Sequence, residues 1–171
     1  MTGAAPPTAR GIIADLYAYG AWASERLLAR AERLSEAELR RTLSAGALPI
    51  LESFTHLVSS DRRWLARCQE AAMPPRLTPA DLPTIAAVRR AADELAEARR
   101  RYIDALDDAA LGAAIRWQDD GETRTLLRWQ GLVQSANHGM QHRSEIAAML
   151  TDLGQSPGDL DFGLWCRTAR H

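Results

Sequence analysis

The sequence contains no lysine, only two cysteines and no long apolar run. The absence of lysine excludes a lysine Schiff base and a lysine nucleophile. Cys68 and Cys166 lie far apart, outside any metal-ligand spacing, and this low cysteine content favours a reducing compartment. No apolar segment reaches the roughly 18–20 residues that span a bilayer, and "MTGAAPPTARG" lacks the apolar run of a signal peptide. We therefore expect a cytoplasmic protein without a membrane partner.

The charge is also nearly balanced, with a formal net charge of −1. Such a balance provides no general attraction to nucleic acid, and the charged face expected on residues 84–107 lacks interleaved aromatic residues. We therefore predict no nucleic-acid partner. The 171 residues, of which 46% are hydrophobic and 25% charged, are typical of a globular protein of one domain. We assign residues 1–171 to that domain.

Four segments carry apolar residues at the three-and-four spacing of amphipathic helices, over about residues 8–34, 49–72, 84–107 and 126–153. The fold class predicted is therefore all-α, a four-helix bundle. The apolar row on the second segment consists of Leu51, Phe54, Val58, Asp61, Leu65 and Cys68. Asp61 is its one acidic member. The row expected on the fourth segment consists of Trp129, Val133, Ala136, Met140, Ala147 and Leu150.

The connections carry recognisable local signals. Ser35 and Glu38 have the spacing of a capping box, which predicts a short helix. In "IRWQDDGETRTLL", apolar and polar residues alternate around Asp120-Gly121, a pair typical of hairpin turns. We predict a short β-hairpin before the last long helix. The tail, "SPGDLDFGLWCRTARH", is expected to fold back over the bundle.

The most informative stretch is "SANHGMQHRSEIAAML", which places His138 and His142 four residues apart. A helix advances about 100° per residue, so both side chains point the same way, one turn apart. Two such imidazoles can bind one metal at about 2.0–2.1 Å, although this spacing also occurs in histidines that face solvent. His56 is the candidate third ligand, since helices of a bundle can each direct a side chain to one interior point. His171, at the chain end, is assigned no role.

The sequence resembles the DinB/YfiT family of metal-dependent enzymes, which is unrelated to the DNA polymerase that shares the name. The resemblance rests on "YGAWASERLL", "RLSEAEL", "AGALPILESFTHLVSSDRRWLAR" and "NHGMQHRSEIAAMLTDLG". It implies a four-helix bundle with up-down-down-up connectivity, a homodimer, and His56, His138 and His142 as the protein ligands of one divalent cation. Gln141 and the Ser144-Glu145 pair depart from the usual family pattern but leave these three positions intact.

Three neutral imidazoles with an open coordination position are typical of catalytic metal sites. Zinc is the leading candidate cation, with nickel or iron as alternatives. Such a metal lowers the pKa of bound water or stabilises a bound thiolate. Glu145 and Asp61 are the nearest acidic candidates to orient a ligand, although each could instead form an ion pair, and Arg143 could clamp a substrate carboxylate.

The resemblance also implies a function, because relatives in the family include thiol-dependent S-transferases and a mycothiol-dependent isomerase. The leading expectation is a metal-dependent transferase or hydrolase, in which the metal activates a low-molecular-weight thiol or water toward a small-molecule substrate. The alternative is a metal-binding dimer without turnover that acts in stress response. A helical bundle without any metal is a third alternative.

Overall fold

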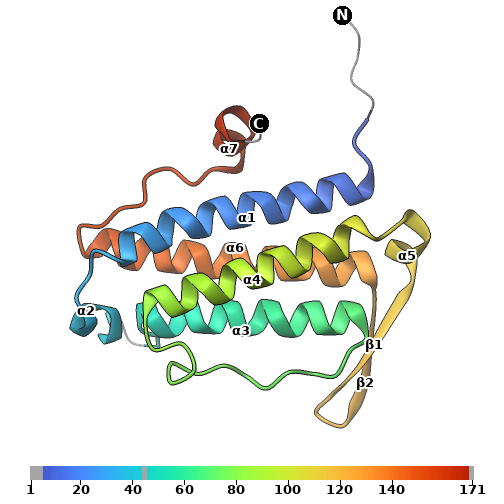
Figure 1. Ribbon diagram of the computed structural model, residues 1–171, viewed down its shortest axis with the longest axis horizontal. Helices are drawn as coiled ribbons and strands as arrows, with labels where there is room; N and C mark the ends of the chain where they lie inside the picture. Colours follow the sequence, from blue (N-terminus) through green and yellow to red (C-terminus); the bar gives the residue numbers. More distant parts are fainter. Residues whose placement is uncertain (1–5, 44–45, 170–171) are drawn as a thin grey trace, which may run out of the picture.

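The computed structural model describes residues 6–43 and 46–169; His171 lies outside these ranges. It consists mostly of helices with a small two-stranded antiparallel sheet. The four long helices are α1 (Ala9–Ala31), α3 (Ile50–Gln69), α4 (Ile85–Asp104) and α6 (Arg128–Asp152). In Figure 1, α1 and α6 run in one direction across the molecule, and α3 and α4 run in the other. Helix α6 packs against both α1 and α3, and α4 packs against the same two helices.

The shorter elements are α2 (Glu36–Arg40), α5 (Asp108–Gly112), α7 (Phe162–Thr168), β1 (Ala114–Asp119) and β2 (Glu122–Leu127). The predicted capping box of α2 is present: the Ser35 hydroxyl accepts from the Glu38 backbone N–H, and the Glu38 carboxylate accepts from the Ser35 backbone N–H. Among the helices of the described residues, none combines the length and the hydropathy that a membrane span requires.

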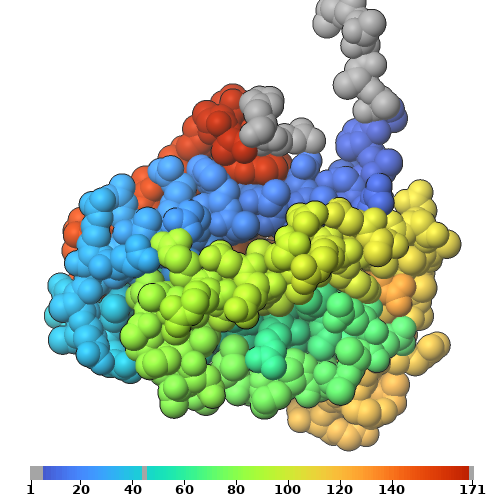
Figure 2. Space-filling model, in the orientation of Figure 1, coloured from blue at the N-terminus to red at the C-terminus, as the bar shows by residue number. Residues whose placement is uncertain are grey.

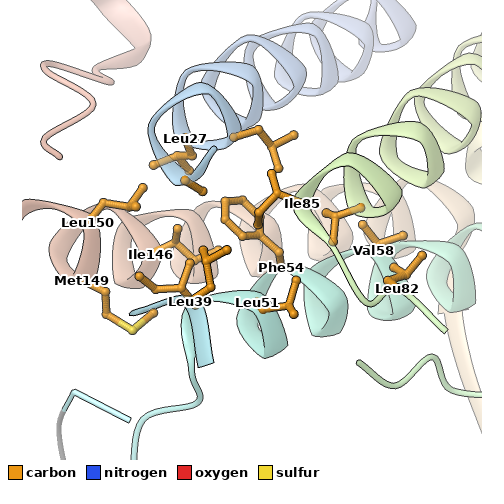
Figure 3. Close-up of a cluster of buried hydrophobic side chains, with 14 residues drawn as sticks. Leu27, Leu39, Leu51, Phe54, Val58, Leu82, Ile85, Ile146, Met149 and Leu150 are labelled. Carbon is orange, nitrogen blue, oxygen red and sulfur yellow. The ribbon is translucent and has the colours of Figure 1, made fainter. Parts of the chain in front are cut away.

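The core lies between the long helices, as Figure 3 shows for Phe54 and its neighbours Leu27, Ile85 and Ile146. The row predicted on residues 49–72 is confirmed in full. Its six members are buried, with exposed fractions between 0% and 8%. The single acidic member, Asp61, is buried with the rest.

The predicted hairpin is confirmed, with β1 and β2 in register from Ala114–Leu127 to Asp119–Glu122. Asp120 and Gly121 form its turn with φ values of 50° and 81°, as the two central residues of a type I′ turn require. Ile115 is 0% exposed and belongs to the same buried cluster as Cys68, so the hairpin is anchored to the end of α3. Because β2 continues to Leu127, the last long helix begins at Arg128, two residues later than predicted.

One helix boundary was wrong and one short helix was not predicted, both because an N-cap was not recognised. The helix predicted over 84–107 ends at Asp104, because the Asp107 carboxylate accepts from the Ala110 backbone N–H and begins α5. In the tail, the Asp161 carboxylate accepts from the Leu164 backbone N–H and begins α7. The tail nevertheless folds back as predicted: it packs on α1, where the Tyr19 hydroxyl donates to the carbonyl of Leu160.

The row predicted on the last long helix was only partly correct, since Leu150 is 0% exposed and Val133, Ala136 and Ala147 are partly buried. Trp129 and Met140 are 42% and 47% exposed. The buried face lies one residue, or about 100°, to the side. It consists of Leu132, Ser135, Gly139, Arg143, Ile146 and Leu150. Half of this face is small or polar, so a pattern of apolar residues selects the neighbouring row instead.

Candidate metal centre

The structure brings the three predicted ligands together at the packed contact between α3 and α6. Potential ligand atoms of His56, His138 and His142 all lie within 4.8 Å of one another. His56 comes from α3, and its ring centroid is 5.5 Å from that of His138 and 4.7 Å from that of His142. Residues more than eighty positions apart in the sequence therefore meet at one point because two helices pack side by side. We call these three residues the histidine cluster.

The spacing within the histidine cluster fits a cation between the rings. The Nε2 atoms of His138 and His142 are 3.1 Å apart. Two ligands of a tetrahedral zinc with bonds of about 2.0–2.1 Å lie about 3.3 Å apart, so the helical pair is close to that arrangement. The ligand atom of His56 lies within 4.8 Å of those of His138 and His142.

Glu145 orients one of the rings. Its Oε2 atom lies 2.7 Å from Nδ1 of His142, one turn along α6. A carboxylate at this position favours the tautomer with the proton on Nδ1, because that N–H can donate to it. The lone pair of His142 Nε2 then points at His138. This contact is the one expected of an acidic residue that orients a ligand, and it is also the ion pair that the sequence left as the alternative; the carboxylate lies on the side of the ring away from His138.

The immediate surroundings keep His56 and His138 neutral. Both side chains are half-buried, and burial is the largest cause that lowers the pKa of each imidazole below its ordinary value. Proximity to His142 lowers both pKa values further. Neutral imidazoles carry the lone pairs that bind metal, so these two rings are ready to act as ligands at neutral pH. The buried Nδ1 of His138 has no hydrogen-bond partner within the described residues.

The other two predicted polar residues, Asp61 and Arg143, face α4 and α1 instead of joining the histidine cluster. Asp61 accepts through Oδ2 from Arg99 Nη1 at 2.8 Å and through Oδ1 from the Ser135 hydroxyl at 3.0 Å. The alternative of an interhelical ion pair is therefore the correct one for Asp61. Arg143 is only 7% exposed and faces the interior of the fold, so it does not reach the metal centre. We call Asp61, Arg99, Ser135 and Arg143 the interior polar cluster.

Sequence reasoning missed two glycines that make room for Arg143. A Cβ on Gly139 would lie 2.9 Å from its Nη1 atom, and a Cβ on Gly20 would lie 3.2 Å from its Nη2 atom. Helices α1 and α6 can thus enclose the guanidinium only where both lack a side chain. Burial lowers the pKa of the Arg143 guanidinium, and Asp61 is the main charge that opposes this shift. The signal available in the sequence was the Gly139–Arg143 spacing of one helical turn.

A cavity borders the histidine cluster. Its volume is about 540 Å³, which is in the range of sites for small molecules. His142 and Glu145 form one side, and apolar residues such as Leu48 and Met149 line another part. A molecule in this cavity would contact the outer edge of the cluster.

The protein's own thiol at position 68 does not take part in the site. Cys68 is 0% exposed, as expected for a small buried hydrophobic residue. Burial is the main cause that raises the pKa of this thiol to about 12, and the thiolate is therefore scarce at neutral pH. Cys68 therefore does not supply a thiol to the histidine cluster.

The chain is thus a mostly helical protein in which three histidines from two packed helices lie close enough together to hold a metal ion. The family model described as the DinB superfamily matches residues 20–146, well over half of the chain. The chain therefore belongs to the DinB superfamily, and the resemblance inferred from its motifs is confirmed. A comparison with curated proteins gives no match.

Proposed function

We propose that this DinB superfamily protein binds one divalent cation through His56, His138 and His142 and is a metal-dependent enzyme. The observation that carries the proposal is the convergence of three imidazoles at the edge of a cavity of about 540 Å³. A bound cation would supply a Lewis acid that stabilises a thiolate or hydroxide at neutral pH. Zinc suits three nitrogen ligands with an open position, and nickel and iron are the alternatives.

Residues of the chain would orient a metal ligand and bind the substrate. Glu145 holds the ring of His142 in one tautomer and one orientation, which keeps its Nε2 lone pair directed into the cluster. The cavity would hold a low-molecular-weight thiol or another small substrate, with its apolar lining against the carbon part of that molecule. The leading reaction is transfer of the thiol sulfur to an electrophilic carbon, with the leaving group released as the S–C bond forms.

Two contacts favour this enzymatic function over a metal-binding dimer without turnover. The Glu145 carboxylate is bonded to Nδ1 of His142, away from the face that His142 turns toward His138, so it does not cap the cluster. The C-terminal tail packs on α1 through Tyr19 and Trp165 instead of covering the histidines. Both contacts support an open coordination position.

The proposal includes the architecture that the resemblance implies. We propose that α1, α3, α4 and α6 form a four-helix bundle with up-down-down-up connectivity, supported by their mutual contacts and by their directions in Figure 1. A homodimer in the cytoplasm is the proposed assembly and location: the homodimer rests on the resemblance, and the location rests on the low cysteine content and the lack of a long apolar run.

The test is a conjugation assay with the full chain loaded with zinc, nickel or iron(II). Bacillithiol, mycothiol and glutathione are each offered with an aryl chloride, from which chloride leaves as the S–C bond forms. We expect a rate that depends on the metal, that is lost in His142→Ala, and that is retained in the neighbouring surface variant Gln141→Ala. A protein that binds metal but gives no metal-dependent rate with any thiol would contradict the transferase proposal and favour the dimer without turnover.

A further inference from the structure

A second cavity lies between the long helices, and none of the three histidines lines it. Its volume is about 350 Å³, and residues of α1, α3, α4 and α6 line it. Figure 2 looks onto the side of the molecule where α1 and α4, two of these helices, lie next to each other. Most of the lining is apolar and includes Leu28, Phe54, Val58 and Val88. Such a cavity suits the carbon body of a small molecule.

Arg143 is the unusual member of this lining. Its side chain is only 7% exposed, yet among the described residues no hydrogen bond or ion pair reaches its guanidinium. Its Nε atom is fully buried without a partner. Arginine is always charged in proteins, and a buried charge without a partner costs several kcal/mol as an order of magnitude. The N–H groups of the Arg143 guanidinium are therefore available to donate hydrogen bonds to a bound anion.

Among the buried charged residues that the structure describes in this lining, Arg143 is the one without an ion-pair partner. Asp61 is the buried carboxylate of the lining, and its two oxygens are already taken by Arg99 and Ser135. Arg99 is thereby neutralised and also lies over the ring of Tyr17, 4.1 Å from the ring centroid. The charge of Arg143 is the one that remains for a ligand.

The outer part of the lining limits the charge of that ligand. Glu25 and Asp93 are exposed carboxylates at the cavity, and Glu25 is paired with Arg89. A dianion such as inorganic phosphate would meet these two carboxylates and Asp61 with only one unpaired cation to offset them. A monoanion with an apolar body matches both the single free guanidinium and the apolar walls.

We propose that Arg143 and this cavity form a binding site for a small organic monocarboxylate, separate from the metal centre. Gly20 and Gly139 leave room for the guanidinium between α1 and α6, because a Cβ would lie 3.2 Å and 2.9 Å from its nitrogens and would force it to shift. The carboxylate accepts two hydrogen bonds from the guanidinium, and the hydrocarbon part lies against Phe54, Val58 and Val88. The site does not depend on whether the histidine cluster binds metal.

The experiment measures the binding of sodium octanoate to the full chain by calorimetry, with 1-octanol as the uncharged counterpart of the same length. We expect octanoate to bind with similar affinity in the metal-loaded and the chelator-stripped protein, and at least about tenfold more tightly than octanol. Octanoate binding that is absent, that octanol equals, or that disappears with the metal would overturn the proposal. The last result would place the carboxylate at the histidine cluster.

Variants locate the site. Arg143→Met should weaken octanoate binding at least about tenfold, whereas Arg100→Gln, a matched loss of charge on the exposed surface of α4, should not change it. Because Arg143 makes no hydrogen bond, Arg143→Met should also raise the melting temperature of the protein without ligand.

Ala92→Leu fills the cavity and leaves Arg143 in place, so it should abolish binding even if the first variant does not fold. Unchanged octanoate binding in either Arg143→Met or Ala92→Leu would contradict the assignment.

Discussion

The two polar clusters are built from the same two helices but have opposite relations to the fold. The histidine cluster takes His56 from α3 and two rings from α6, all half-buried. The interior polar cluster takes Asp61 from α3 and Ser135 and Arg143 from α6, with Arg99 added from α4, and all four are buried. The first offers lone pairs to a ligand without supporting the core. In the second, Asp61 of α3 contacts Arg99 of α4 and Ser135 of α6, so losing these contacts should affect stability first.

The largest effect is expected at Asp61. Asp61→Asn removes the charge that compensates the buried Arg99 and should lower the free energy of unfolding by about 3–5 kcal/mol, the usual result of breaking a buried pair. Urea denaturation monitored by circular dichroism measures this change. Glu36→Gln is the control, because it breaks a surface pair whose carboxylate is 79% exposed. An equally small effect in both variants would show that the interior polar cluster is not structural.

A substitution in the histidine cluster should lower metal affinity and leave the helical structure unchanged. His142→Ala should reduce zinc affinity by more than about 100-fold, since losing even a group that supports a ligand costs 10–100-fold. Helicity should be unchanged, because the buried face of α6 does not include His142. Competition with a chromogenic chelator measures the affinity, and far-UV circular dichroism measures the helicity. If His142→Ala unfolds, the histidine cluster supports the core as the interior polar cluster does, and the contrast between the two clusters would be wrong.

Glu145 provides a smaller effect at the same cluster. Glu145→Gln keeps the size of the side chain but replaces the charged acceptor of the His142 Nδ1–H, so zinc affinity should fall by about 10–100-fold. The chelator competition serves here too, with Ser144→Ala as the neighbouring exposed control. Affinity equal to that of the unmodified protein would mean that Glu145 does not orient the ring.

The smallest effect is a pH dependence of the protein without metal. The pKa values of His56 and His138 are lowered in the folded state, so below about pH 6.5 the unfolded chain binds more protons than the folded protein does. The stability from these groups is therefore present above pH 6.5 and is lost as pH falls. Urea denaturation at pH 7.5 and 5.5 measures the loss, which should be smaller in His56→Gln than in the unmodified chain.

This prediction also has a control. Gln141→Ala removes an exposed group that does not titrate, so it should show the same loss between the two pH values as the unmodified protein. An unchanged loss in His56→Gln would indicate that other groups cause the pH dependence.

How far the sequence could predict the molecule differs between its two main helices. On α3 the apolar row is nearly continuous, so its phase, including the buried Asp61, followed directly from the spacing. On α6 the buried face contains Ser135, Gly139 and Arg143, which an apolar pattern cannot recognise. The predicted row was therefore displaced by one residue, and the burial of Arg143 was missed.

The candidate site shows the same limit. The spacing of His138 and His142 fixed their relative position, because one helix connects them. Joining His56 to that pair depended on the family resemblance, since the packing of α3 on α6 is not encoded in any local spacing. Arg99 and the two glycines beside Arg143 could not be identified before the helices were placed together.

The most direct test of the central claim is zinc K-edge X-ray absorption on the loaded protein. The account predicts about one zinc per chain, three imidazole nitrogens at about 2.0–2.1 Å and one further light atom from solvent. The spectrum of His56→Ala should lose one imidazole. A zinc with fewer than three imidazole ligands in the unmodified protein, or no zinc retained after reconstitution, would contradict it.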